Sequence, residues 1–352
     1  MSEIGKASQR FLKEVIFKKL GKSNEKVILG PKLGGDFAAI KIDEENVLLI
    51  TSDPLSIIPS LGLRESAWIT VHLLASDLAT SGVAPQFAVL DYNLPPHLSY
   101  SDFEIYWNSI HEEMEKLGIA IVGGHTGKYE GCDFTVVGGG VMFSFAKKDE
   151  YVASSMAKEG DALILTKGVA ISASSILARV FKEKVEKEFG ARVQKKLSDM
   201  LYSFSTVKDS LTAARLGLRK VVHAMHDCTE GGLLGAIYEL CEASEKGVIV
   251  YKDRIEIDED IKAVCELFKI DPLKSLNEGG LLCCVEKEYA EDLVKEFKKE
   301  GIKAFEIGEI KNKDYGRWLI EDNKKIMIES VDIDPYWEAF WRELEINKSK
   351  LN

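Results

Sequence analysis

The sequence predicts a protein of two domains in the α/β or α+β class. Its 352 residues exceed the size at which single hydrophobic cores usually stop growing, roughly 250–300 residues. Segments with strand-like and helical patterns of apolar residues alternate along the chain, which is typical of helices packed against sheets. A polar stretch at 147–151 interrupts the alternation. We therefore predict a first domain over residues 1–155 and a second over residues 156–352.

The first domain is expected to combine a short N-terminal helix with strands and two longer helices. The N-terminal helix is amphipathic and ends before Gly21. Ser101 is a suitable N-cap for a helix whose apolar residues recur at helical spacing. Strands are expected at 37–42, 47–51, 86–92, 119–122 and 134–143, and the longer helices at 64–81 and 102–117.

The second domain opens on a turn that contains Gly160 and Asp161, followed by a strand over 162–166. A final helix over 334–344 is rich in aromatic residues, and we expect it to pack on this domain rather than to serve a partner. Further helices are expected at 172–182, 194–217, 232–244, 259–268 and 288–300, and strands at 221–225, 248–251, 281–286, 304–310 and 316–320.

Composition excludes several classes of protein. The formal net charge of −11 argues against a nucleic-acid partner, which would require a basic face. It does not argue against a phosphate ligand, because a bound metal ion reverses the local field. The six cysteines form no C-x₂-C pair, so we interpret them as reduced structural thiols. The N-terminus lacks the apolar core of a signal peptide, and no apolar run approaches the ~18 residues of a membrane span, so we expect a cytoplasmic protein.

The familiar phosphate-binding and hydrolase motifs are missing. No G-x-x-x-x-G-K-[ST] phosphate loop occurs, although Gly127-Lys128 comes nearest to one. No G-x-G-x-x-G follows the first strand, and neither G-x-S-x-G nor H-E-x-x-H is found. Any chemistry must therefore come from residues scattered along the chain.

Two aspartates lie beside strand-forming segments. Asp36 follows Gly34-Gly35 at the start of a strand, where the glycines allow close approach of a ligand and the carboxylate can reach a metal. A plain β-turn is the alternative. Asp53 follows the apolar segment 47–50, and ligand-binding groups gather at strand ends in sheet proteins. A turn capped by Asp before Pro is the alternative there.

A third aspartate, Asp77, lies inside the apolar helical segment 68–80. Burying an unpaired carboxylate costs several kcal/mol, so Asp77 should bind a metal or pair with a cation. Arg64 is the only arginine nearby in sequence and is the structural alternative.

Two glycine-rich segments end predicted strands. Gly123-Gly124-His125-Thr126 would offer backbone NH groups and a hydroxyl to phosphate oxygens, although a lone histidine is more often structural. In the second domain, His226 and Asp227 end a strand, and a helix begins after Gly231-Gly232. That helix N-terminus suits an anion. Thr229 as an ordinary cap is the alternative.

In this order and spacing, the segments resemble the AIR-synthase (PurM-type) superfamily, and its HypE-like branch most of all. That superfamily includes aminoimidazole ribonucleotide synthase, thiamine-monophosphate kinase, selenophosphate synthetase and HypE-type maturation factors. The resemblance runs through most of the chain. It rests on Gly35-Asp36-Phe-Ala-Ala, Thr51-Ser-Asp53-Pro, Ala75-Ser-Asp77-Leu, Gly123-Gly-His-Thr126, Gly160-Asp161, His226-Asp-Cys-Thr-Glu-Gly-Gly-Leu233, Asp271-Pro-Leu, Glu278-Gly-Gly280 and Ile307-Gly308.

The resemblance implies a PurM-like two-domain fold. Its N-terminal domain forms a shared β-barrel in a homodimer, and its C-terminal α/β domain covers the cleft. It also implies that Mg²⁺, or Mn²⁺, and ATP bind without a phosphate loop. The metal positions match Asp36, Asp53, Asp77 and Asp227, with Gly123, Gly124, His125 and Thr126 beside them. Mg²⁺ suits such a site, because it prefers a few carboxylates together with water and phosphate oxygens.

The sequence departs from the patterns of the best-known members. Phe37 stands where several members have a second acid, and His125 stands where kinase-type members have aspartate. HypE-type factors end in a cysteine that accepts a carbamoyl group, whereas no cysteine follows Cys284. Selenophosphate synthetase needs a reactive residue near its N-terminus, whereas the first cysteine is Cys132. Each of these specific activities is therefore weakened.

We accordingly expect a metal-dependent enzyme that cleaves a phosphoanhydride or phosphate ester, with hydrolysis as the first hypothesis. Asp53, Asp77 and His125 are the predicted catalytic residues, and Gly34, Gly35, Thr126, Gly231 and Gly232 are among the predicted ligand-binding ones. One alternative is ATP-dependent activation of an amide oxygen, as in AIR synthase. Another is a nucleotide-binding maturation partner that does not turn over.

Overall fold

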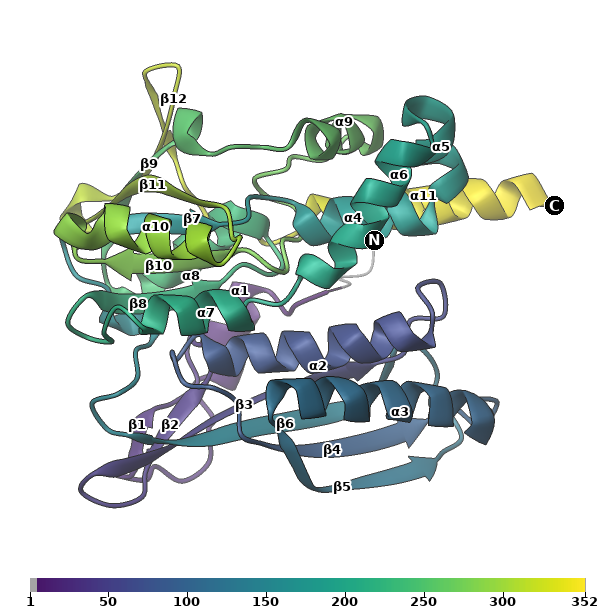
Figure 1. Cartoon of the computed structure of the whole chain (residues 1–352), viewed down its shortest axis with the longest axis horizontal. Helices are drawn as coiled ribbons and strands as arrows, with labels where there is room; N and C mark the ends of the chain where they lie inside the picture. The colour runs from purple at the N-terminus through teal and green to yellow at the C-terminus, as the bar shows by residue number, and fades with distance from the viewer. Residues whose placement is uncertain (1–4, 352) are drawn as a thin grey trace.

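A computed structural model describes residues 5–351, with side chains described for residues 5–346. The chain forms two α/β layers that stack on each other, with the first sheet on the outside of one layer (Figure 1). Among the described residues, no helix is both long and apolar enough to cross a membrane.

The N-terminal half forms a six-stranded mixed sheet in the order β1-β2-β3-β6-β4-β5. Its neighbouring strands are antiparallel except for the parallel pair β4 and β5. The helical turn α1, with a π-helical turn after it, precedes the sheet. The elements are α1 (Gln9–Phe11), the π-helical turn (Leu12–Ile16), β1 (Val27–Leu29), β2 (Ala38–Lys41), β3 (Asn46–Ser56), α2 (Leu63–Ala79), β4 (Phe87–Leu94), α3 (Tyr100–Leu117), β5 (Ala120–Lys128) and β6 (Val136–Lys147).

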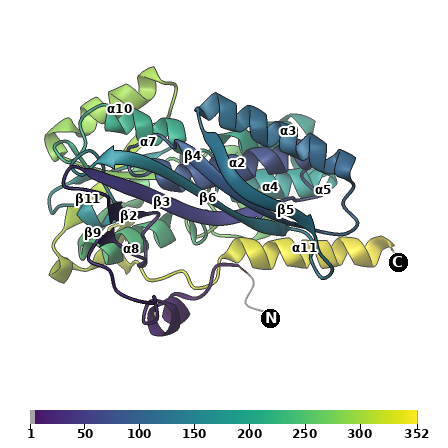
Figure 2. The same ribbon diagram turned by 90° about the horizontal axis from the view of Figure 1, so that it is seen from below.

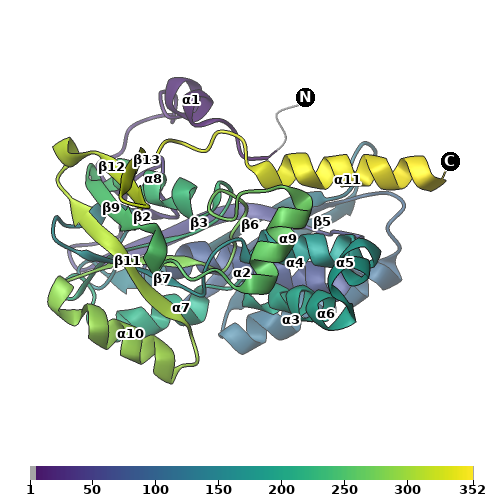
Figure 3. The ribbon, with the colours of Figure 1, turned by 90° about the horizontal axis from the view of Figure 1, so that it is seen from above.

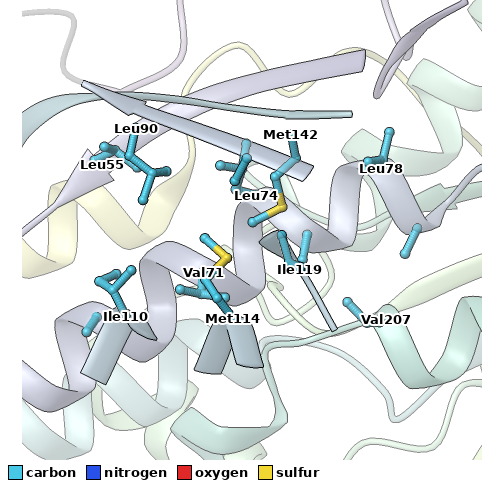
Figure 4. Close-up of a cluster of buried hydrophobic side chains, with 14 of the residues drawn as sticks. Leu55, Val71, Leu74, Leu78, Leu90, Ile110, Met114, Ile119, Met142 and Val207 are labelled. Atoms are coloured by element: carbon cyan, nitrogen blue, oxygen red, sulfur yellow. The ribbon is translucent and has the colours of Figure 1, made fainter. Parts of the chain in front are cut away.

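Helices α2 and α3 cover one face of this sheet, whereas no helix of residues 5–351 lies over its other face (Figure 2). Leu55 and Leu90 of the sheet pack with Leu74 of α2 and Met114 of α3 in one buried cluster (Figure 4). Val207 of the C-terminal half joins the same cluster. The two halves of the chain therefore share part of a hydrophobic core, and α2 is buried between them.

The C-terminal half forms a seven-stranded sheet in the order β13-β12-β9-β11-β7-β10-β8, with only β9 and β12 parallel. One face packs against α7 and α10 and the other against α8, so each face has its own apolar cluster. The elements are β7 (Ala162–Thr166), α4 (Ile171–Val180), α5 (Lys182–Phe189), α6 (Ala191–Asp199), α7 (Val207–Ala214), β8 (Val222–Asp227), α8 (Gly232–Ser244), β9 (Gly247–Tyr251), α9 (Glu259–Phe268), β10 (Leu281–Val285), α10 (Ala290–Lys299), β11 (Ala304–Lys311), β12 (Arg317–Glu321), β13 (Lys324–Met327) and α11 (Pro335–Leu351).

The predicted α/β or α+β class is confirmed, and most predicted elements occur within a few residues of their expected bounds. The single helix predicted over 194–217 is wrong. The chain instead forms α6, a 3₁₀ turn at Met200–Ser203 and then α7. A hydrogen bond to another helix stabilises the break, because the backbone N of Thr206 donates to Ser76 Oγ of α2 at 2.9 Å. A long-range contact of this kind cannot be read from helical periodicity.

Candidate functional site

The four predicted metal-binding aspartates come from both halves of the chain, and their carboxylates interact electrostatically. Asp36 precedes β2, Asp53 lies in β3, Asp77 lies near the end of α2, and Asp227 ends β8. The carboxylates of Asp227, Asp53 and Asp36 all interact electrostatically with Asp77. The structure therefore brings the four residues together where the two halves meet.

Asp53 does not end its strand, as the sequence suggested. Strand β3 continues to Ser56, but β2 stops pairing with it at Ile50. Beyond that point β3 is paired only with β6, so Pro54 is tolerated without the loss of a ladder hydrogen bond. The side of β3 at Asp53 is thereby left open toward the C-terminal half. Burial, opposed by Lys6 and reinforced by Glu230, raises the pKa of Asp53 to about 6.

Asp77 has no arginine or lysine within ion-pair distance among the described side chains, so the alternative of an Arg64 partner is wrong. Its Oδ2 lies 3.2 Å from Thr51 Oγ1, and the same hydroxyl lies 2.8 Å from the backbone carbonyl of Asp36. Burial raises the pKa of Asp77 well above the ordinary value, and the neighbouring carboxylates raise it further. Thr51 thus links Asp77 to the loop that carries Asp36.

Asp36 is held by a chain of buried groups. His226 Nδ1 lies 2.7 Å from Asp36 Oδ1, and His226 Nε2 lies 3.4 Å from Glu239 Oε2. Burial lowers the pKa of His226, but the carboxylates of Asp36 and Glu239 outweigh it and raise the pKa to about 10. His226 is therefore a cation at neutral pH that donates to Asp36 and orients it.

The donor set fits a hard divalent cation. Asp36 Oδ2 is buried and has no hydrogen-bond partner within the described part of the chain. Burial and the charge of Asp36 raise the pKa of Asp227 to about 7. Ligand atoms of Asp36, His226 and Asp227 lie within 4.8 Å of one another. His226 Nδ1 faces Asp36, and its Nε2 is buried 3.4 Å from Glu239 without a hydrogen bond in the described part of the chain. Oxygen atoms are the ligands that Mg²⁺ prefers, so the four aspartates are the candidate ligands for Mg²⁺ or Mn²⁺.

Sequence reasoning gave no role in this site to three charged residues, although Glu278 belongs to one of the motifs on which the resemblance rests. Glu278 lies beside Asp227 and Asp53, and burial raises its pKa well above the ordinary value. Glu239 lies within the apolar helix α8, and this is the same signal that identified Asp77. Lys6 lies in the polar N-terminal segment, and no sequence pattern marks it as a site residue.

Two of the predicted ligand-binding glycine pairs, Gly34-Gly35 and Gly231-Gly232, contact other parts of the same chain. A side chain on Gly34 would place its Cβ 2.4 Å from the backbone oxygen of Glu239, so this glycine permits contact between the two halves of the chain. Gly35 follows it in the turn before Asp36. At the start of α8, the backbone N of Gly231 donates to Asp334 Oδ2 at 2.8 Å, and Gly232 N donates to Thr229 O. The carboxylate of Asp334 therefore lies at this helix N-terminus, where the sequence had suggested an anionic ligand.

The segment Gly123–Thr126 does not end a strand but lies in the middle of β5. Gly124 pairs with Leu90 of β4, which pairs with Gly140 of β6 opposite Asp53. Three strand spacings of ~4.8 Å separate β5 from β3, or ~14 Å in all. His125 is exposed, and its Nε2 lies 2.6 Å from Tyr129 Oη. Within one chain, His125 and Thr126 thus lie apart from the aspartates.

A second histidine of β8 also pairs with an aspartate. His223 Nδ1 lies 2.7 Å from Asp161 Oδ1, and Lys158 Nζ lies 2.9 Å from the other ring nitrogen. Asp161 Oδ2 in turn accepts from the backbone N of Lys158 at 2.8 Å. Although Glu286 lies close enough to complete a metal-binding group, these polar atoms are satisfied by the protein, and the cluster is best explained as structural.

Sequence comparisons assign both halves of the chain to a known family. The N-terminal model of the AIR synthase related proteins matches residues 34–142, and the C-terminal model matches residues 158–319. The chain belongs to this family, as its motifs predicted. The matches end and begin on either side of residue 155, and the domain boundary there stays a prediction.

The chain is 25% identical to a putative hydrogenase expression/formation protein of Methanocaldococcus jannaschii, over 93% of this chain and 92% of that one. It is 26% identical to the carbamoyl dehydratase HypE of Azotobacter vinelandii, over 64% of this chain and 63% of the relative.

Solved structures show the same fold. The chain matches a structure of a HypE–HypF complex with a TM-score of 0.70 and 20% identity, covering 91% of this chain and 99% of the other. It matches AaThiL complexed with AMPPCP and TMP with a TM-score of 0.68 and 20% identity, covering 91% and 94%. The predicted PurM-like fold is therefore confirmed.

Proposed function

We propose that this protein is a metal-dependent enzyme that uses ATP to activate an oxygen atom of an amide-type substrate by phosphoryl transfer. The observation that carries the proposal is the meeting of Asp36, Asp53, Asp77 and Asp227 from both halves of the chain, with one buried carboxylate oxygen of Asp36 unpartnered. Relatives named carbamoyl dehydratase and a structural neighbour solved with AMPPCP support ATP as the phosphoryl donor.

The site's residues have distinct parts in this scheme. His226 fixes Asp36 through Nδ1, and Thr51 fixes Asp77, so two of the carboxylates are oriented before any ligand arrives. A divalent metal held by the four aspartates would supply positive charge against the phosphate oxygens. Catalysis would then be mainly positioning and charge neutralisation. The substrate oxygen bonds to the γ-phosphorus, and ADP leaves with the electrons of the broken phosphoanhydride bond.

The first hypothesis from the sequence, simple phosphate hydrolysis, receives no support from the named relatives. Two of them are called carbamoyl dehydratase and selenide, water dikinase, which are not names of phosphatases. Hydrolysis therefore becomes the alternative, and activation of an amide oxygen becomes the main proposal. A nucleotide-binding maturation partner remains a second alternative, since one structural neighbour was solved as a HypE–HypF complex.

We further propose that a homodimer brings Gly123, Gly124, His125 and Thr126 to the site. Strand β5 lies at the edge of its sheet, and most of its residues are exposed. Val122, Tyr129, Val136 and Phe145 are large exposed hydrophobic residues of β5, β6 and the loop between them. Such an edge is a template for pairing with another chain. In a dimer of this kind, His125 would contact phosphate in the site of the partner copy.

The test is formation of ADP from ATP with Mg²⁺, with Mn²⁺ and with EDTA, alone and with a panel of primary amides and thiocarboxamides. ADP formation that requires both metal and one class of amide supports the proposal. Metal-dependent release of phosphate without any acceptor would replace it with hydrolysis. Saturable ATP binding without turnover, across metals and acceptors, would favour the binding partner.

A further inference from the structure

Lys6 is joined to the acidic site from the far end of the sequence. Its backbone N donates to Glu230 Oε2 at 2.7 Å, and its Nζ lies 3.3 Å from Glu239 Oε1. Glu239 is the residue that contacts His226, which in turn holds Asp36. Glu239 therefore links the ammonium group of Lys6 to His226, the residue that orients Asp36.

The charge of Lys6 acts directly on those ligands. Its ammonium interacts electrostatically with Asp36 and Asp227, and it also acts on Asp53. Without a metal, the site holds several carboxylates at close quarters, and like charges at such distances are unfavourable. The ammonium of Lys6 offsets this repulsion in the structure described.

The side chain of Lys6 lies where it could move away from Glu239 without unfolding the protein. Its side chain is 49% exposed, whereas that of Glu239 is 7% exposed. Lys6 lines a shallow cleft together with Ser8, Gln9, Glu230 and Asp334. Figures 2 and 3 show α1 standing out from the body of the molecule, joined to it on both sides by extended chain. We call residues 5–16 the N-terminal arm. A second lysine of this arm, Lys13, forms a 2.6 Å ion pair with Glu242, which lies on the same helix as Glu239.

We propose that Lys6 is a tethered counter-cation that occupies the mouth of the carboxylate site before the metal binds, and that the metal must displace it. The inference rests on the proposed function, because it takes the four aspartates to be metal ligands. It assigns to the N-terminal arm a role that the sequence did not indicate. Binding of the metal would release Lys6 Nζ from Glu239, whereas the contact between Lys13 and Glu242 would keep the arm near α8.

The experiment is titration of the full chain with Mn²⁺ in the absence of nucleotide, followed by the loss of the electron paramagnetic resonance signal of free Mn²⁺. The variants are Lys6→Met, which keeps an unbranched side chain one atom shorter and removes its charge, and Lys13→Met as the matched control. Lys13 anchors the same arm by a similar ion pair, but its partner Glu242 is not one of the site residues. Circular dichroism confirms that both variants are folded.

We expect Lys6→Met to bind Mn²⁺ about ten-fold more tightly than the wild type, since one competing positive charge is removed from a partly buried site. Lys13→Met should bind with nearly wild-type affinity, because exposed ion pairs contribute little. Equal or weaker binding by Lys6→Met would overturn the role of Lys6 and leave the metal site standing. No Mn²⁺ binding by any of the three proteins would overturn the metal site itself, and the proposed function with it.

Discussion

Strand β8 carries two histidines, His223 and His226, and each lies 2.7 Å from an aspartate, yet the surroundings of the two pairs differ. The pair of His223 and Asp161 is completed by Lys158, which contacts the second ring nitrogen and also donates its backbone N–H to the aspartate. The pair of His226 and Asp36 is followed by Glu239 at 3.4 Å, and it leaves Asp36 Oδ2 without a partner.

The difference shows how a buried His–Asp pair can serve either structure or ligand binding. A buried polar cluster whose members are all satisfied stabilises one arrangement of the chain. A cluster that keeps an unpartnered buried oxygen and several mutually repelling carboxylates is less stable by itself, and a bound ion would complete it. Substitutions in the two clusters should therefore have opposite effects on stability and activity.

The largest effect is expected from removing a proposed metal ligand. Asp53→Asn and Asp77→Asn, tested as single variants, should each lower metal-dependent nucleotide turnover by about 10³-fold, the scale on which loss of one charge-stabilising group acts. Initial rates of ADP formation with Mg²⁺ provide the measurement. Asp161→Asn serves as the control and should retain most of the activity, because its cluster is separate. Turnover by Asp53→Asn or Asp77→Asn at the wild-type rate would remove that residue from the site.

A contrast in stability should separate the two histidine pairs. Asp161→Asn should lower the free energy of unfolding by about 2 kcal/mol, since it weakens the buried hydrogen bond from His223 to the carboxylate and a bond to the backbone of Lys158. Asp227→Asn should raise it at pH 8 without metal, because one of several repelling carboxylates is removed. Urea unfolding in EDTA measures both. A large loss of stability in Asp227→Asn would show that its carboxylate is structural, like that of Asp161.

The pH dependence of stability should follow from the same repulsion. The native pKa values of Asp53 and Asp227, about 6 and about 7, lie above the ordinary carboxyl value. The folded protein therefore binds more protons than the unfolded chain between about pH 4 and pH 7. The stability that these groups contribute is present below that window and is lost as the pH rises through it. His226, whose native pKa is about 10, extends the loss to higher pH.

We thus expect the metal-free protein to melt at a lower temperature at pH 8 than at pH 5.5. Mg²⁺ should raise the melting temperature more at pH 8, where the aspartates are ionised. Differential scanning fluorimetry in EDTA and in Mg²⁺ measures both effects, and Asp227→Asn should show a smaller dependence on pH. A metal-free protein that is more stable at pH 8 than at pH 5.5 would contradict the described cluster.

The fold could be predicted from the sequence, and so could those site residues that interrupt a local pattern of apolar residues. Asp77 stood out because it interrupts an apolar helix, and the motif order identified the family. Reasoning of the same kind, applied to α8, would have found Glu239. It could not find Lys6, whose contacts lie more than 220 residues away in the chain. It also placed Asp53 and Gly123–Thr126 at strand ends, because the length of a strand depends on neighbours that pattern alone does not reveal.

The smallest effect concerns His125, which lies on the exposed edge strand and not in the carboxylate cluster. His125→Ala should leave the free energy of unfolding nearly unchanged, since exposed side chains contribute little. It should lower turnover by about ten-fold if the residue contacts phosphate in the partner copy, as expected for loss of one charge-assisted hydrogen bond.

Mixing the His125→Ala and Asp227→Asn proteins tests this action between copies. After subunit exchange, half of the dimers would carry one of each, and one of their two sites would be intact, so about a quarter of wild-type activity should return. His125→Ala mixed with itself is the control and should show no recovery. If activity does not return although a mixed dimer forms, His125 acts outside the site, and its bond to Tyr129 is then only a surface contact of β5.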